Sequence, residues 1–178
     1  MSEFPPKEVQ LLVTEISGIL RLRNQTLGVS EAACGGLISA YLVSVPGASN
    51  FYIGGKLVYS LKQRLKLSGW SDSDISHYMG PSEEVALRLA RTTKYELGST
   101  FVLSETGYAG PGTDLHLNDS IKVKENNGSE VGTVFLGLHG PNLEVSTTKR
   151  TTSQVRALNM AQFAKFALEF LLEQLKAQ

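Results

Sequence analysis

The stretch that decides the fold is Thr26-Leu-Gly-Val-Ser30, followed by a turn of small residues that ends in Gly35-Gly36. A short apolar run that meets such a turn, and then a segment with helical periodicity, predicts a strand, a tight turn and the start of a helix. The unpaired amide groups of the first helical turn and the helix dipole favour an anion there. We therefore predict a phosphate or oxyanion site at this junction. Close packing of the helix against the sheet is the competing explanation of the two glycines.

Helical and strand patterns alternate on both sides of this stretch. We expect helices at residues 6–23, 36–45, 61–66, 83–97 and 153–176, and strands at 26–30, 51–60, 100–104, 131–138 and 143–148. Residues 68–81 and the loop 105–112 are expected to be irregular, and residues 113–128 to be a polar loop with a short strand at 120–124. The pattern predicts an α/β fold, a three-layer α/β/α sandwich around a mixed sheet, with parallel pairing among the early strands. We expect one domain over residues 1–178.

Composition excludes several classes of protein. The 178 residues contain 17 Lys+Arg and 17 Asp+Glu, so the net charge is zero and nothing favours nucleic acid or an anionic membrane as a partner. The apolar runs are shorter than the ~20 residues of a membrane helix. The first residues lack a basic region followed by an apolar core, and the single cysteine, Cys34, allows no internal disulfide. We therefore expect a soluble, cytoplasmic protein.

The common signatures of catalytic and cofactor sites are absent. There is no G-x-G-x-x-G, no Walker loop, no G-x-S-x-G elbow and no C-x-x-C pair. His77, His116 and His139 lie in separate predicted loops without ligand spacing, so we expect no metal and no cofactor. Cys34, near a predicted helix start, is either a reactive thiolate or a small buried apolar residue, and the second reading is favoured.

Ser49 lies just beyond a predicted helix end at Pro46-Gly47. A serine hydroxyl needs a base to act as a nucleophile. Arg64 cannot be that base, because a guanidinium stays protonated at physiological pH. Lys62 and Lys66 are expected on the face of the short helix opposite Arg64, which would place them poorly for a site built around position 64.

Six segments carry a resemblance to one family in order and spacing. They are Ser30-Glu-Ala-Ala-Cys-Gly-Gly36, Pro46-Gly-Ala-Ser49, Gly54-Gly-Lys-Leu-Val-Tyr-Ser60, Tyr78-Met-Gly-Pro-Ser-Glu-Glu84, Thr106-Gly-Tyr-Ala-Gly-Pro111 and Val131-Gly-Thr-Val134. The chain resembles the CinA C-terminal domain family, whose enzymatic members are nicotinamide-nucleotide amidohydrolases, also called NMN deamidases. The match runs from about residue 26 to 134, with both flanking helices compatible.

The resemblance implies hydrolysis of the carboxamide of nicotinamide mononucleotide to nicotinate mononucleotide and ammonia, by a serine that a lysine activates. It also implies a pyridine nucleotide as ligand and a homo-oligomer. Catalytic roles then fall on Ser49, as nucleophile, and on Tyr59 and Thr106. The substrate-binding residues implied are Glu31, Cys34, Gly35, Gly36, Arg64, Gly107 and Gly110.

Several positions depart from the family pattern. Where the family turn reads E-S-C-T-G-G, Ala32 replaces a pocket serine and Cys34 a threonine. In the family segment Y-S-N-x-x-K, the lysine position is Arg64 here. The late G-D-R segment is missing, and Lys149-Arg150 is only a loose substitute for its arginine.

Three interpretations follow from these matches and departures. An active amidohydrolase would use Ser49 with Lys62 or Lys66 as base. A catalytically impaired member would keep a nucleotide-binding pocket, or it would be an interaction or regulatory protein that keeps only the fold. Altered chemistry would use Cys34. The loss of the base favours a pocket kept for binding.

Overall fold

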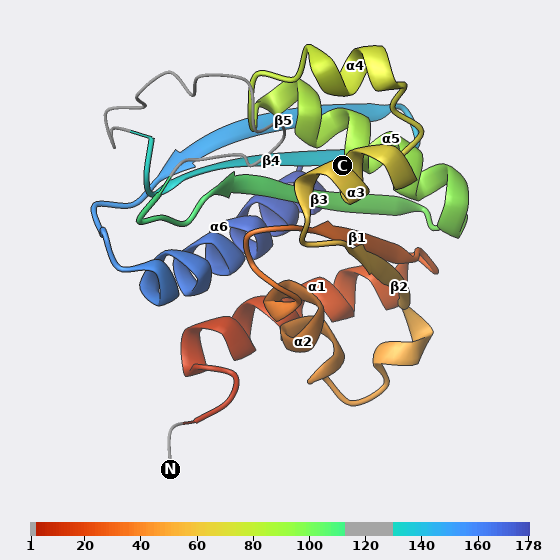
Figure 1. The fold of residues 1–178 in the computed structure, drawn as a ribbon. Helices are drawn as coiled ribbons and strands as arrows, with labels where there is room; N and C mark the ends of the chain where they lie inside the picture. The colour runs from red at the N-terminus through yellow and green to blue at the C-terminus, as the bar shows by residue number, and fades with distance from the viewer. Residues whose placement is uncertain (1–2, 113–129) are drawn as a thin grey trace.

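Helices and strands alternate along the chain in the computed structural model, which describes residues 3–112 and 130–178 (Figure 1). The helices are α1 (Lys7–Leu22), α2 (Leu37–Val43), α3 (Leu61–Leu67), α4 (Asp72–Ser76), α5 (Glu83–Leu97) and α6 (Arg156–Lys176), with a short 3-10 helix, η1, at Ala48–Asn50. The strands are β1 (Leu27–Glu31), β2 (Tyr52–Leu57), β3 (Phe101–Tyr108), β4 (Thr133–Gly140) and β5 (Leu143–Arg150).

The described strands form one mixed sheet in the order β2-β1-β3-β4-β5. β1 pairs in parallel with β2 and β3, whereas β4 is antiparallel to β3 and to β5. The mixed sheet and the parallel pairing of the early strands are therefore confirmed. Because β1, β2 and β3 run in the same direction, the residues that follow them gather at one edge of the sheet.

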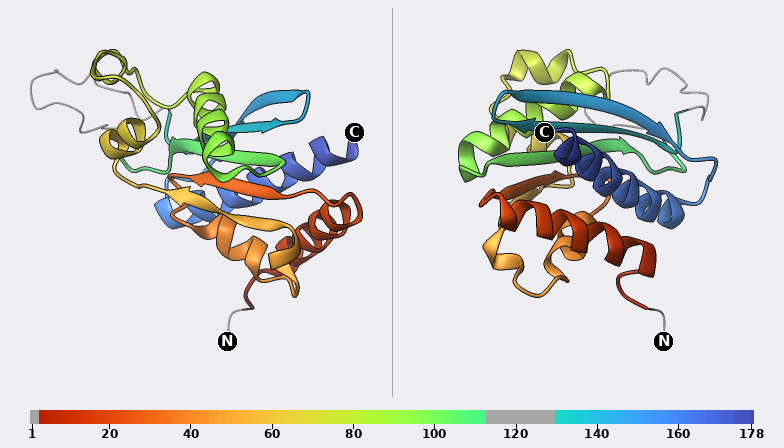
Figure 2. Two further views of the ribbon diagram at one scale, coloured as in Figure 1. Left: turned by 90° about the vertical axis from the view of Figure 1, so that its right-hand side faces the viewer. Right: turned by 180° about the vertical axis from the view of Figure 1, so that it is seen from behind.

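The helices form a layer on each face of this sheet. α1, α2 and α6 pack on one another against one face, and α5 covers the other (Figures 1 and 2). In α1, the buried residues Val9, Val13, Ile16 and Leu20 recur every three or four positions, which is why that helix presents one apolar face to the core. The predicted three-layer sandwich is confirmed. None of the described helices reaches the length and hydrophobicity that crossing a bilayer requires.

α5 shows how local sequence sets the boundaries of an element. The Ser82 hydroxyl accepts the N–H of Val85 at 3.1 Å and caps the first turn, and Gly98 adopts a left-handed conformation just past the last residue. The prediction of a helix at 83–97 is confirmed with the same bounds.

Two segments predicted to be irregular are more regular in the structure. Residues 68–81 contain α4, which begins with a reciprocal capping box between Ser71 and Asp74. β3 continues through Thr106 to Tyr108, so part of the predicted loop is a strand. Gly107 permits this extension, because a Cβ at that position would lie 2.5 Å from the carbonyl oxygen of Thr133 on β4.

The predicted hairpin of β4 and β5 is present, and the last helix begins at Arg156 instead of at residue 153. The predicted loop 113–128, its strand at 120–124 and His116 lie outside the described residues.

Candidate functional site

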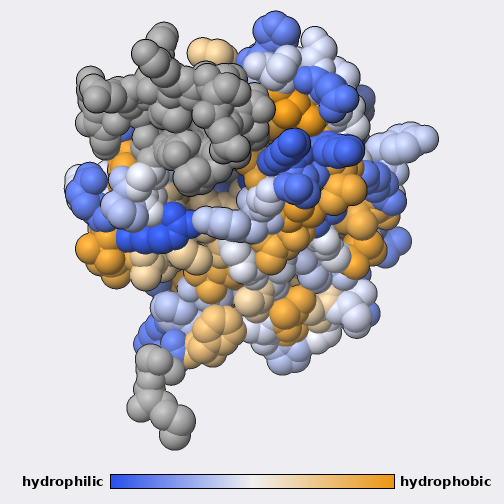
Figure 3. All heavy atoms as spheres, viewed as in Figure 1, coloured by the Kyte–Doolittle hydropathy of each residue, from blue (hydrophilic) through white to orange (hydrophobic). Residues whose placement is uncertain are grey.

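A cavity of about 370 Å³ lies where the carboxyl ends of β1 and β3 meet the start of α3. Its walls come from Ala32 and Ala33, from the segment between β2 and α3, from the end of β3 and from Arg156. Ligands of α/β proteins bind at this edge of the sheet. On the face of the molecule that carries α3, hydrophilic side chains border hydrophobic ones (Figure 3). The cavity is therefore the candidate ligand site.

Arg64 of α3 brings a buried positive charge to the cavity. The residue is 7% exposed, and its Nη2 donates to the Thr106 hydroxyl at 3.2 Å. Its Nε has no acceptor among the described residues. Burial lowers the pKa of Arg64, and the neighbouring Tyr78 and Glu105 act in the opposite direction. Because a guanidinium stays protonated at physiological pH, the cavity holds a permanent cation.

Arg156, in the first turn of α6, joins two walls of the cavity. Its guanidinium donates to the carbonyl of Gly110 at 2.6 Å and to the hydroxyl of Tyr59. Arg156 was absent from the sequence prediction. A sequence signal does exist, since a cation at a helix N-terminus opposes the helix dipole and therefore suggests a role outside the helix.

The turn after β1 wraps around the carboxylate of Glu105. The backbone N–H groups of Ala32, Ala33 and Cys34 donate to it at 3.0, 3.1 and 3.0 Å. Glu105 is fully buried, and burial raises its pKa, whereas the amide groups of Ala32 and Cys34 and the charge of Arg64 lower it. Side chains alternate along β3, so Glu105 points to the turn and its neighbour Thr106 points to Arg64.

Glu31, predicted to bind substrate, instead caps α2. Its carboxylate accepts the N–H groups of Ile38 and Ser39, both at 2.9 Å, and the Ser39 hydroxyl at 2.6 Å. The amide groups predicted to bind an anion at this junction therefore donate to the protein's own carboxylates, Glu31 and Glu105. Gly35 and Gly36 have φ values of 62° and 97°, so the turn geometry accounts for both glycines.

Ser49, predicted as the nucleophile, is not part of the cavity wall. It is exposed in η1, which precedes β2, whereas Tyr59 follows β2. The carbonyl of Phe51, the next residue but one, accepts the N–H of Leu27 at the amino end of β1. β2 extends for roughly 20 Å, at the rise of about 3.3 Å per strand residue, and it separates Ser49 from the cavity residues Tyr59 and Ser60.

Cys34 is a core residue and lies outside the cavity wall. It is 1% exposed, and its thiol donates to the carbonyl of Met160 on α6 at 3.8 Å. Burial raises its pKa well above the usual range, and the charges of Glu105 and Glu31 add to this effect. The structure supports the buried apolar reading, because a thiol that stays protonated is a weak nucleophile.

We accordingly expect Cys34 to resist iodoacetamide at neutral pH. Because the thiol is both protonated and enclosed, the native protein should stay unlabelled over a period in which the unfolded chain reacts completely. Intact-mass spectrometry in buffer and in guanidinium chloride measures the difference. Equal labelling rates in the two solutions would show that the thiol is accessible.

The cavity collects part of the predicted set of site residues. Tyr59, Arg64, Gly107 and Gly110 line it, and Thr106 contacts Arg64. Lys62 also lines it, contrary to the prediction that it faces away from Arg64. The reason is that the cavity envelops the start of α3, so residues on different sides of its first turn reach the same space.

The suggested substitutes for the missing family arginine lie elsewhere. Lys149 and Arg150 end β5, where Lys149 pairs with Val134 and the Nε of Arg150 donates to the Thr133 hydroxyl. Neither belongs to the cavity wall. Among the described residues that follow β4, Arg156 is the basic residue that lines the cavity.

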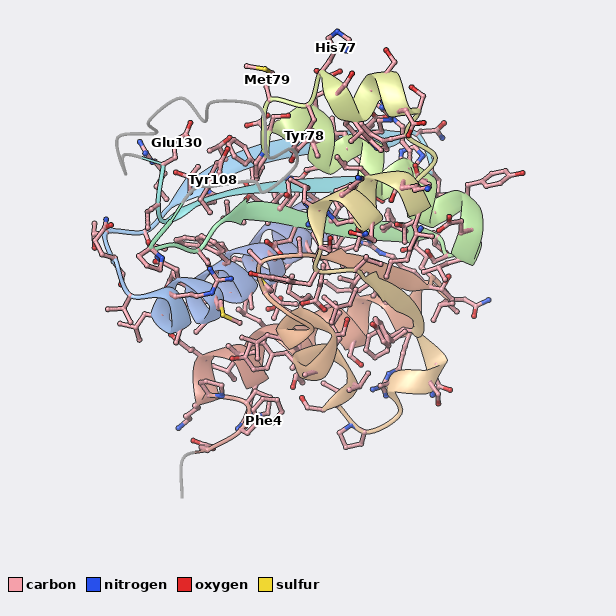
Figure 4. The ribbon with its side chains drawn as sticks, viewed as in Figure 1. Phe4, His77, Tyr78, Met79, Tyr108 and Glu130 are labelled. Carbon is pink, nitrogen blue, oxygen red and sulfur yellow. The ribbon has the colours of Figure 1, made fainter. Side chains whose placement is uncertain are left out.

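Two tyrosines border this region from different elements (Figure 4). Tyr108, at the end of β3, lines the cavity, and burial with a smaller contribution from Glu130 raises its pKa to about 12. Tyr78 comes from the segment between α4 and α5. Burial raises the pKa of its hydroxyl, whereas the charge of Arg64 and a hydrogen bond with that side chain lower it. Both hydroxyls therefore keep their protons at neutral pH and can donate hydrogen bonds.

No cluster of three or more histidine, cysteine, aspartate or glutamate side chains within residues 3–112 and 130–178 is arranged to hold a metal ion. His77 is exposed, and His139 lies 3.6 Å from the carboxylate of Glu144. A second hollow, of about 530 Å³, lies between the starts of α1 and α6. It contains none of the predicted site residues.

Comparison with protein families and with known sequences gives one consistent result. The model of the CinA C-terminal domain matches residues 9–175. CinA-like proteins from Nostoc punctiforme and Myxococcus xanthus are 32% identical over 147 and 158 residues, which is 82% and 89% of this chain. The chain spans only 32% and 35% of the length of these two relatives.

Solved structures resemble this one over nearly its full length. A CinA superfamily protein from Klebsiella pneumoniae superposes with a TM-score of 0.82 at 20% identity, covering 96% of this chain and 99% of the other. The competence/damage inducible protein CihA from Agrobacterium tumefaciens gives a TM-score of 0.81 at 23% identity, with 97% and 98% covered. At these identities the likeness shows the fold.

Proposed function

Because the chain belongs to the CinA C-terminal domain family, we propose that its cavity binds a pyridine mononucleotide without hydrolysing the carboxamide. The observation that carries this proposal is Arg64, a buried guanidinium at the cavity where the resemblance expects the activating lysine. Arginine binds an anion well but cannot remove a proton from a nucleophile at physiological pH.

The cavity also lacks the hydroxyl that the resemblance expects at position 32. Ala32, which stands where the resemblance expects a pocket serine, lines the cavity with a methyl group. Ser49 lies at the other end of β2, and the thiol of Cys34 is buried in the core. A cationic cavity that lacks both the activating lysine and the pocket serine supports binding without turnover.

The cations of the cavity suit a phosphorylated ligand. Lys62 and Arg156 line it together with Arg64, and its described walls contain no aspartate or glutamate. Arginine in particular matches the geometry of phosphate and carboxylate oxygens. Tyr59 and Tyr108 add aromatic surface beside these charges, which suits a ring-bearing ligand.

We expect the purified protein to bind nicotinate or nicotinamide mononucleotide in calorimetry while releasing no ammonia from the latter above the enzyme-free background. Arg64→Gln should weaken binding of nicotinate mononucleotide at least about tenfold, the effect of losing one charged hydrogen-bond pair. Ser49→Ala, far from the cavity, is the matched control and should bind as the wild type does.

Two results would contradict this function. Ammonia release that disappears in Ser60→Ala would reveal a hydrolase that uses the one serine lining the described cavity wall. Absence of heat with both mononucleotides would leave a protein that keeps only the fold.

A further inference from the structure

Arg64 brings to the inner end of the cavity a buried hydrogen-bond donor that lacks an acceptor. The Nε of Arg64 is buried and has no acceptor among the described residues. The hydroxyl of Tyr78 lies beside the guanidinium and interacts with it by charge and by a hydrogen bond. Arg64 itself is more than nine-tenths buried. An unpaired buried donor destabilises the folded protein. An acceptor supplied by a ligand would remove that destabilisation.

A carboxylate satisfies this arrangement better than a carboxamide does. Guanidinium has five N–H donors and no acceptor, and a carboxylate has two acceptor oxygens and no donor. The two can therefore form paired, charge-assisted hydrogen bonds. A carboxamide offers one oxygen, and its NH₂ group would face the N–H groups of Arg64. Donor opposite donor is repulsive and leaves one buried group unpaired.

The charges at the inner end of the cavity differ from those at its mouth. Arg64 interacts electrostatically with Glu105, so its charge is already partly balanced, and a monoanion is better accommodated there than a dianionic phosphate. At the mouth, Lys62 is exposed and Arg156 reaches the exposed Tyr59. These two cations suit the phosphate of the same ligand.

Resting on the proposed function, we infer that Arg64 forms a carboxylate subsite and that the protein selects a nucleotide whose ring carries a carboxylate over the corresponding carboxamide. The ligand lies with its carboxylate on Arg64 and its phosphate between Lys62 and Arg156. In the terms of the family reaction, the cavity favours the acid over the amide.

Calorimetry with a matched pair of ligands tests this inference. Nicotinate mononucleotide and nicotinamide mononucleotide differ only in the group that would meet Arg64. We expect the acid to bind wild-type protein at least tenfold more tightly. Arg64→Gln should bring the ratio close to one, because a glutamine amide offers both a donor and an acceptor. Arg156→Gln should weaken both ligands and keep the ratio, and Lys149→Gln, which removes a charge outside the cavity wall, should change neither.

Inorganic phosphate serves as a third ligand and shows whether Arg64 binds the carboxylate or the phosphate of the nucleotide. If Arg64→Gln abolishes phosphate binding and Arg156→Gln does not, Arg64 holds the phosphate and the inference is wrong. Equal affinity of wild-type protein for acid and amide also overturns it, while leaving nucleotide binding in place. Binding of neither mononucleotide contradicts the proposed function as well. The comparison in wild-type protein stands even if the Arg64 variant fails to fold.

Discussion

A double variant that carries Ala32→Ser and Arg64→Lys is expected to release ammonia from nicotinamide mononucleotide, whereas we expect no release by the wild-type protein. Both positions line the same cavity, so a hydroxyl at 32 and an amine at 64 would enter one space. Burial disfavours the charged form of an amine, and a lysine there can therefore act as a base where an arginine cannot. Base activation contributes about 10²–10⁴-fold in rate, so we expect turnover at least about 10²-fold above the wild-type background.

The single variants sharpen this test. Residues that act as one catalytic unit are strongly non-additive, so Ala32→Ser alone and Arg64→Lys alone should both stay at background. Adding Ser49→Ala to the double variant should leave the new activity unchanged, because Ser49 precedes β2 and the cavity follows it. A folded double variant that binds the mononucleotide but releases no ammonia would mean that a serine at 32 and a lysine at 64 are not enough for turnover.

The fold was largely predictable because its elements carry strong local signals. The helix at 83–97 has a serine cap before it and a glycine after it, and both residues play those parts in the structure. α4 was missed because it is five residues long and buries only Ile75, so it has almost no periodicity to detect. Its capping box, Ser71 with Asp74, was the available signal.

The candidate site was less predictable, because sequence proximity misleads in a parallel sheet. Ser49 and Tyr59 are ten residues apart in the chain, yet β2 lies between them and places them at opposite edges of the sheet. Arg156 follows Tyr59 by almost a hundred residues and donates a hydrogen bond to its hydroxyl. The sequence also could not show that the backbone N–H groups expected to bind a ligand instead donate hydrogen bonds to the carboxylates of Glu31 and Glu105.

Glu105→Ala is expected to cause the largest loss of stability of any substitution near the cavity. The carboxylate accepts three backbone N–H groups of the turn after β1, and all three lie in the core. Alanine would leave these donors without a partner, at a cost of about 1–3 kcal/mol for each buried group. We expect the free energy of unfolding to fall by at least about 3 kcal/mol, measured by urea denaturation followed by circular dichroism.

Two further variants identify the cause of that loss. Glu105→Gln keeps the size of the side chain but has one acceptor oxygen in place of two, so it should lose a large part of the same free energy. Glu144→Ala, on β5, removes a carboxylate whose partners are the surface residues Arg91 and His139, and should change stability by less than about 1 kcal/mol. If Glu105→Ala were as stable as Glu144→Ala, the turn would hold its shape without the carboxylate. Packing alone would then have to hold Ala32 in the cavity wall. The direction in which a serine at position 32 points would not depend on Glu105.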